Sequence, residues 1–137
     1  MSKLHSLMKD RLEAWIQVEG FPGFEVKLSY LSRPELERIR KSVTRQVLNK
    51  RTRAMEDEVD SEAFTKVLVK SAILDWKGFT VGHALKMLPI EVPQGTPDDE
   101  LFEFTPEDAL QLVQNSPIFD TWLNEAIFDL DSFRTKS

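Results

Sequence analysis

Side chains that could do chemistry are sparse in this chain. Histidine occurs only at His5 and His83, and cysteine is absent. The two histidines are far apart in the sequence, and neither has a carboxylate at a helical metal-ligand spacing, which argues against a zinc site. No serine or threonine stands in a glycine-rich elbow with a histidine placed as its base. These patterns predict a protein that is not an enzyme and that uses no cofactor.

Acidic pairs are the remaining candidates for a metal site. Asp98 and Asp99 are adjacent, and Asp129 is followed closely by Asp131. Neither pair has the spacing of a calcium loop, and both lack the glycine that such a loop needs. We interpret them as surface acids.

Charge is unevenly distributed along the chain, whose formal net charge is −5. Residues 33–53 carry eight basic groups against two acidic ones, a local charge of +6. Residues 90–137 carry eleven acidic groups against two basic ones, a local charge of −9. The basic segment could contact nucleic acid phosphates, but no aromatic residues interleave with its cations, so we favour protein contacts through Arg38 and Arg45. A nucleic-acid-binding regulator is the alternative interpretation.

The N-terminal third predicts a helix followed by one strand. Apolar residues at helical spacing predict an amphipathic helix over 4–16. After a glycine- and proline-containing break, alternation predicts a strand over about 24–31. One strand cannot form a sheet, so it must pair with another chain, pair with residues 90–92, or lie extended on the helices. Pairing with another chain would make the protein self-associate.

The middle of the chain predicts two long helices. Ser32 and Glu35 form a capping-box pattern that opens a helix reaching about Arg53, followed by an acidic linker over 56–60. Asp60 or Ser61 can cap a second helix over 61–77. That segment is apolar on most sides, which is typical of the centre of a bundle. We expect Trp76 to be buried and Gly78 to form a left-handed helix cap.

The C-terminal part predicts shorter helices around a loop. Thr80 can cap a helix over 81–88, and Thr105 with Pro106 marks another helix start. A further helix is expected over 117–130, and a disordered tail over 134–137. Phe104 and Trp122 are the candidate anchors for a partner, should they prove exposed.

These elements together predict a mainly α fold. We expect a small helical bundle with one short N-terminal strand and a C-terminal helical hairpin. Its parts would be a helical core domain over 1–89, a flexible acidic linker over 90–101 and a helical segment over 102–137. The apolar stretches are too short to span a membrane.

The order of these elements resembles the tail assembly chaperones of long-tailed bacteriophages. The resemblance covers about residues 21–130. It is carried by the strand at 24–28, the segment Ser32–Leu36 with its basic helix, and the stretches 69–80 and 115–123. The most specific of these is Ile73–Thr80, while the helix over 4–16 does not map onto the family pattern.

The resemblance implies a mostly helical, non-catalytic protein. Such a protein binds the hydrophobic tape measure protein, keeps it soluble, and recruits the major tail protein during tube assembly. It would act in the host cytoplasm and be absent from the mature virion. A permanent tail or connector subunit of the virion is a further alternative.

Overall fold

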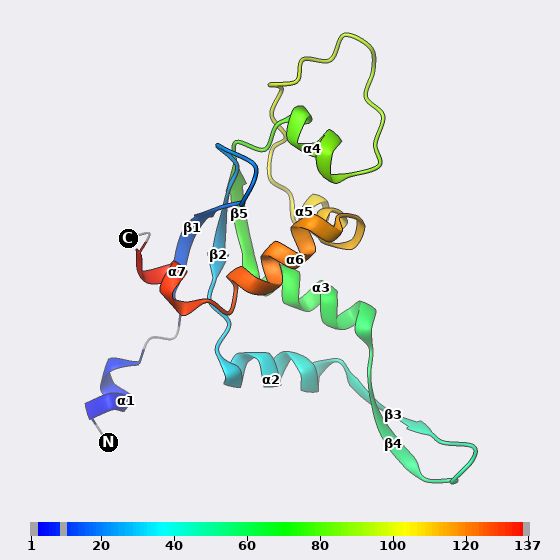
Figure 1. Cartoon of the computed structure of the whole chain (residues 1–137). Coiled ribbons are helices and arrows are strands. Elements are labelled where there is room, and N and C mark those ends of the chain that lie inside the picture. Colours follow the sequence, from blue (N-terminus) through cyan, green and yellow to red (C-terminus); the bar gives the residue numbers. More distant parts are fainter. Residues whose placement is uncertain (1–2, 9–10, 136–137) are drawn as a thin grey trace.

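The computed structural model describes residues 3–8 and 11–135 and shows a mixed α/β protein (Figure 1). The mainly α prediction is wrong, because the described residues contain 45% helix and 21% strand in two antiparallel sheets. The elements are α1 (Lys3–Leu7), β1 (Glu13–Gln17), β2 (Glu25–Ser29), α2 (Arg33–Ser42), β3 (Thr44–Leu48), β4 (Met55–Val59), α3 (Ser61–Ala72), β5 (Ile73–Lys77), α4 (Val81–Met87), α5 (Pro106–Asn115), α6 (Pro117–Ala126) and α7 (Leu130–Thr135).

The predicted helix over 4–16 is two different elements. Helix α1 ends at Leu7, and residues 13–17 form β1. Ala14 and Ile16 are buried while Glu13 and Gln17 are exposed, so this segment follows the period of a strand. Leu4 and Leu7 of α1, and Met8 just after it, stay 65–71% exposed, so they do not share one buried apolar face with residues 13–16 as the predicted helix required.

Strand β2 is the middle of a three-stranded antiparallel sheet with the order β1-β2-β5. None of the three predicted surroundings for this strand is correct, because both of its partners come from segments that were expected to be helical. Trp15 lies opposite Lys27 on one side, and Val26 lies opposite Trp76 on the other. Helix α3 ends at Ala72, and the chain turns extended at Ile73, with φ −101° and ψ 114°. The apolar run that suggested a central helix is therefore a helix followed by a buried strand.

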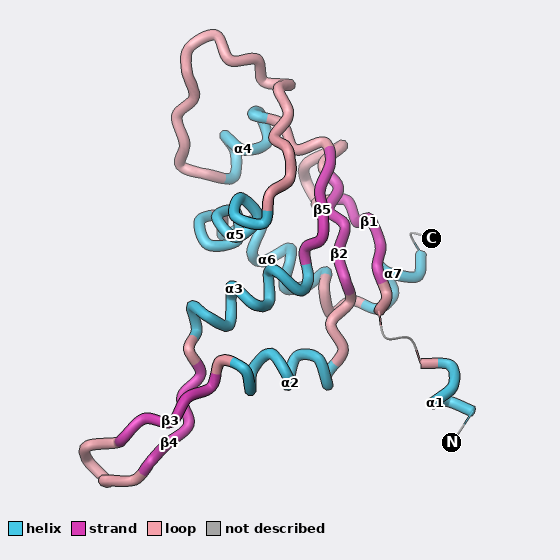
Figure 2. Tube along the Cα trace, turned by 180° about the vertical axis from the view of Figure 1, so that it is seen from behind, coloured by secondary structure: helices cyan, strands magenta, loops and turns pink. Residues whose placement is uncertain are grey.

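The predicted basic helix over 33–53 is also divided. Helix α2 ends at Ser42, and β3 pairs with β4 in a separate two-stranded antiparallel sheet. The expected acidic linker over 56–60 mostly belongs to β4. In this hairpin Arg45 lies opposite Glu58, so opposite charges face each other across the strands. Figures 1 and 2 show the hairpin extending away from the rest of the molecule.

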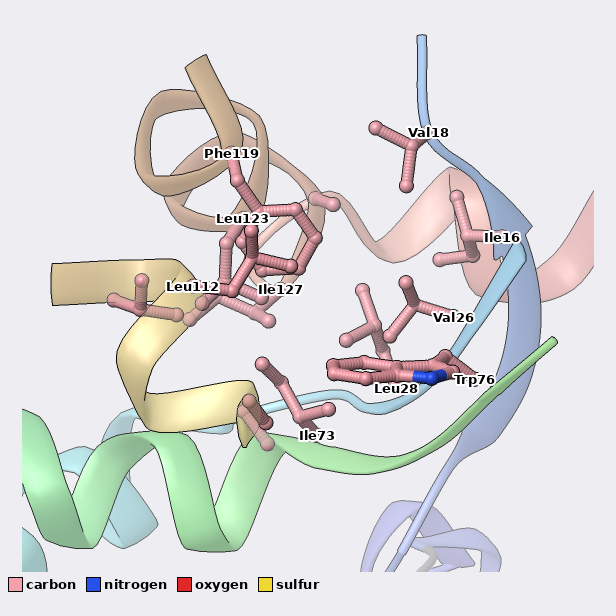
Figure 3. Packing of buried hydrophobic residues seen from close by; sticks show 14 of the residues in the cluster. Ile16, Val18, Val26, Leu28, Ile73, Trp76, Leu112, Phe119, Leu123 and Ile127 are labelled. Atoms are coloured by element: carbon pink, nitrogen blue, oxygen red, sulfur yellow. The ribbon is translucent and has the colours of Figure 1, made fainter. Parts of the chain in front are cut away.

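Helices α3 and α5 pack on the three-stranded sheet, and α6 packs on α5 (Figure 2). Figure 3 shows side chains from the sheet meeting those of α5 and α6, with Trp76, Leu112 and Phe119 among them. Helix α7 lies against β1. The buried residues form one hydrophobic cluster that runs from Ala14 to Phe133. This cluster holds the sheet and the C-terminal helices together.

The predicted caps at helix starts are present, but the prediction that Gly78 is a helix cap is wrong. Gly78 has the expected left-handed φ of +73°, yet it follows β5 rather than a helix, because α3 already ends at Ala72. The side chains of Ser32, Asp60, Thr80 and Thr105 each accept a hydrogen bond from a backbone amide at the start of a helix. His83 completes a capping box with Thr80, and its Nδ1 accepts from the Thr80 amide at 3.3 Å. The predicted helix over 117–130 ends at Ala126, and α7 begins at Leu130. Residues 134 and 135 of the expected disordered tail belong to α7, and residues 136–137 lie outside the described residues.

Ser116 caps the start of α6 from a buried position, so its contribution to stability can be tested by substitution. Its side chain is 1% exposed, and its Oγ accepts from the Phe119 amide at 3.1 Å. Ser116→Ala should lower the free energy of unfolding by about 1–2 kcal/mol, because the amide loses its acceptor away from water. Chemical denaturation measures this change. Thr105→Ala removes a cap whose hydrogen bond is exposed and should cost less. If Ser116→Ala and Thr105→Ala lower the free energy of unfolding equally, burial does not increase the contribution of the cap.

Candidate protein-binding surfaces

A groove of about 360 Å³ lies between β5, α4 and α5. Trp76, Phe79 and Leu112 form apolar parts of its wall and are buried. Asp108 and Gln111, both exposed, are the polar residues on its α5 side, together with Asn115. The complete lining of this groove, which we call the α5 groove, is Trp76, Phe79, Ala84, Leu88, Pro89, Ile90, Phe102, Asp108, Gln111, Leu112 and Asn115.

The wall of the α5 groove is preorganised by contacts of Trp76. Its Nε1 donates a hydrogen bond to the carbonyl of Phe102 at 2.9 Å. Its ring meets Phe79 and Phe104 edge to face, with centroids 5.2 and 5.1 Å apart. These contacts join β5 to the segment that leads into α5. An apolar groove with a few polar groups along one side can bind an apolar segment of a partner.

The two aromatic residues predicted as partner anchors lie in different places. Phe104 is half-buried on Trp76, before α5. Trp122 is half-buried on α6, where its ring lies 5.4 Å from that of Phe119. Both side chains pack against the core cluster. The groove is lined by neither of them, and it brings together residues that no sequence motif linked.

The predicted contact residues Arg38 and Arg45 are both exposed but lie on separate elements. Arg38 is on α2, and Arg45 is on β3 of the projecting hairpin. A second hollow, of about 560 Å³, lies beside α2 and has charged residues in its wall. Its lining is Tyr30, Leu31, Arg33, Leu36, Glu37, Arg40 and Phe128.

The projecting hairpin is the second candidate surface, which sequence reasoning missed. We call β3, β4 and their connecting loop over 49–54 the arm. Leu48 and Met55 lie opposite each other near its end, and each is 57% exposed. Residues 44–48 read Thr-Arg-Gln-Val-Leu and show no period-two alternation, so the sequence offered no strand pattern there, and the clustered cations suited the expected amphipathic helix.

Within the part of the chain that the structure describes, no group of three or more histidine, cysteine, aspartate or glutamate side chains is arranged to hold a metal ion. No helix of residues 3–8 and 11–135 combines the length and hydrophobicity that a membrane crossing requires.

Comparison with family models, curated proteins and solved structures found no match to this chain.

Proposed function

We propose that this protein is a tail assembly chaperone of a long-tailed bacteriophage. It binds an apolar segment of the tape measure protein in the α5 groove, keeps that protein soluble, and helps recruit the major tail protein. The observation that carries the binding role is the groove itself, which is open, apolar and held in shape by Trp76. The identity of the client rests on the resemblance over residues 21–130.

The lining of the α5 groove suits a helical client. A helix that docks in a groove inserts a few apolar side chains spaced three or four residues apart. Leu88, Ile90 and Phe102 are only half-buried and offer apolar surface to such side chains. Burial contributes about 25 cal/mol per Å² of apolar surface, so a few anchors can hold the client without making release slow. Asp108 at the margin favours a basic residue beside the apolar ones.

Chaperone action also requires that the protein leaves its client. We propose that it works in the host cytoplasm and is absent from the mature virion. Mass spectrometry of purified particles tests this point. A stoichiometric amount of the chain in washed particles would instead support a permanent tail or connector subunit.

Filling the α5 groove should abolish the chaperone effect. In Gln111→Trp, an exposed residue of the groove wall is replaced by a large side chain that occupies the space for the client. We expect co-expression with the wild-type chain to raise the soluble fraction of the tape measure protein several-fold, and the variant to lose most of that gain. The measurement is the amount of tape measure protein in the supernatant after centrifugation.

Gln114→Trp is the matched control, because Gln114 is exposed on the same helix but does not line the groove. It should retain the wild-type effect. If the tape measure protein is equally soluble with and without the wild-type chain, the proposed function is wrong. If both tryptophan variants act like the wild type, the client does not use the α5 groove.

A further inference from the structure

An exposed acidic surface lies beside the α5 groove without belonging to its lining. We call it the acidic rim and define it as Asp98, Asp99, Glu100, Leu101 and Glu103, all exposed. Leu101 is an apolar side chain 61% exposed among these carboxylates. Residues 90–129 contain ten acidic residues and no lysine or arginine, so the rim has no cation close to it in sequence. No ion pair within 4 Å among the described residues involves its four carboxylates.

The acidic rim is held in place by backbone hydrogen bonds. The amides of Val81 and Gly82 donate to the carbonyls of Glu100 and Asp98, both at 2.8 Å, and the Phe102 amide donates to Phe79 at 2.9 Å. A Cβ at Gly82 would lie 3.3 Å from the Asp98 carbonyl oxygen, which shows how closely the backbone at Gly82 approaches the backbone at Asp98. These bonds fix the rim against the start of α4. A partner that binds the rim therefore loses little free energy to ordering this segment of the chain.

The end of the arm carries the opposite charge. Lys50, Arg51 and Arg53 are exposed in the loop beyond the apolar pair Leu48 and Met55. None of these three cations forms an ion pair within 4 Å among the described residues. Among the described elements, β3 and β4 make their extensive contacts with each other. A two-stranded hairpin of this kind is marginally stable, so docking on another surface would stabilise the arm.

We propose that the end of the arm of one copy docks on the acidic rim of a second copy. The three cations would meet the carboxylates, and Leu48 with Met55 would cover Leu101. Each surface has an exposed apolar centre, and the loop cations beyond Leu48 and Met55 are opposite in charge to the rim. The acidic residues Glu56, Asp57 and Glu58 follow Met55 on β4, on the side of the apolar pair away from the loop. There Glu58 lies opposite Arg45, and Glu56 accepts a hydrogen bond from the Asn49 side chain. The α5 groove remains free, so this contact is separate from the proposed client site.

The arm and the rim lie at opposite ends of the molecule in both views (Figures 1 and 2). The arm of one copy therefore cannot reach the acidic rim of the same copy. Because the two docking surfaces differ, the contact is of the head-to-tail kind, which produces closed rings or open chains of copies. Such an array would present a series of α5 grooves to a long client.

Sedimentation velocity of the full chain alone tests this association. We expect oligomers at about 100 µM in about 0.1 M salt, and their dissociation at about 1 M salt, where the screening length falls from about 10 Å to about 3 Å. The variant Lys50→Gln/Arg51→Gln/Arg53→Asn should associate at least tenfold more weakly. The rim variant Asp98→Asn/Asp99→Asn/Glu100→Gln should show the same loss. Asparagine is chosen at position 53 because Arg53 has a φ of 60°.

Mixing the two variants provides the sharpest result. The arm variant keeps a normal rim and the rim variant keeps a normal arm, so the mixture should form one-to-one heterodimers although each variant alone is monomeric. Arg33→Gln/Arg38→Gln/Lys41→Gln removes the same charge from α2 and should associate like the wild type.

Three outcomes would overturn the proposal. They are a wild-type chain that stays monomeric to about 500 µM in low salt, an arm variant that associates normally, and variants that fail to combine when mixed. Dissociation of the oligomers by a short DNA duplex that binds the arm tightly would assign the arm to nucleic acid instead. Because no client is present, these results do not depend on the proposed function.

Discussion

Replacing Trp76 with alanine is expected to lower the free energy of unfolding by about 3–5 kcal/mol. Trp76 is 5% exposed and its ring meets those of Phe24, Phe79 and Phe104. Alanine would leave a cavity at the junction of the sheet with α5, and the Phe102 carbonyl would lose the hydrogen bond from Nε1. The same change should reshape the α5 groove, because the ring forms part of its wall.

Chemical denaturation followed by far-UV circular dichroism measures this loss. Trp15→Ala is the matched control, because Trp15 is half-buried on the same sheet and lies under Lys77, with Nζ 4.4 Å from the ring centroid. It should cost about 1 kcal/mol. Trp76→Phe should fall between the two, since it keeps a ring but removes the donor. Equal losses at positions 15 and 76 would show that Trp76 is not a packing centre.

Gly78→Ala should be about as damaging, at about 3 kcal/mol or more, although only one methyl group is added. Gly78 has a φ of +73°, which lies in the left-handed region, and that conformation alone costs alanine about 1–2 kcal/mol. A Cβ at this position would also overlap the backbone carbonyl of Gly23. Relief requires a shift of the chain that leads into β2, which is the central strand of the sheet.

Gly20→Ala separates the two contributions. Gly20 has a φ of +88°, but a Cβ there would meet no atom within 4 Å. Gly20→Ala should therefore lower the free energy of unfolding only by the cost of the left-handed backbone conformation, about 1–2 kcal/mol. Thermal unfolding of the two variants beside the wild type measures the difference. If Gly78→Ala is no more destabilising than Gly20→Ala, the close approach of Gly23 to Gly78 is not a constraint on the fold.

Helix starts could be predicted from the chain because their causes are local. A capping side chain accepts a hydrogen bond from an amide three residues later, as Thr105 does from Asp108 and Ser116 does from Phe119. No distant segment takes part in that bond. The separation of charge into a basic middle and an acidic end is likewise readable without coordinates.

The strands depended on partners that lie far away in the sequence. Residues 13–17 and 73–77 are five-residue segments with three apolar residues each, and segments this short satisfy the periods of a helix and of a strand equally well. Val26 pairs with Ile16 on one side and with Trp76 on the other, 50 residues away in the numbering. The hydrogen bonds of a sheet connect different segments, so the extended form of each strand is stable only after the others are in place.

The two candidate surfaces arise in the same way. The α5 groove joins residues from 76 to 115, and the acidic rim is placed by its bonds to residues 79–82. Residue types and local hydrogen bonding therefore set the caps, the charges and the buried character of segments such as 64–76. Strand pairing and tertiary packing decided whether segments such as 13–17 and 73–77 form helix or strand. They also placed the cationic loop at the end of the arm and assembled the α5 groove. Each of these features requires contacts that residues adjacent in the sequence cannot supply.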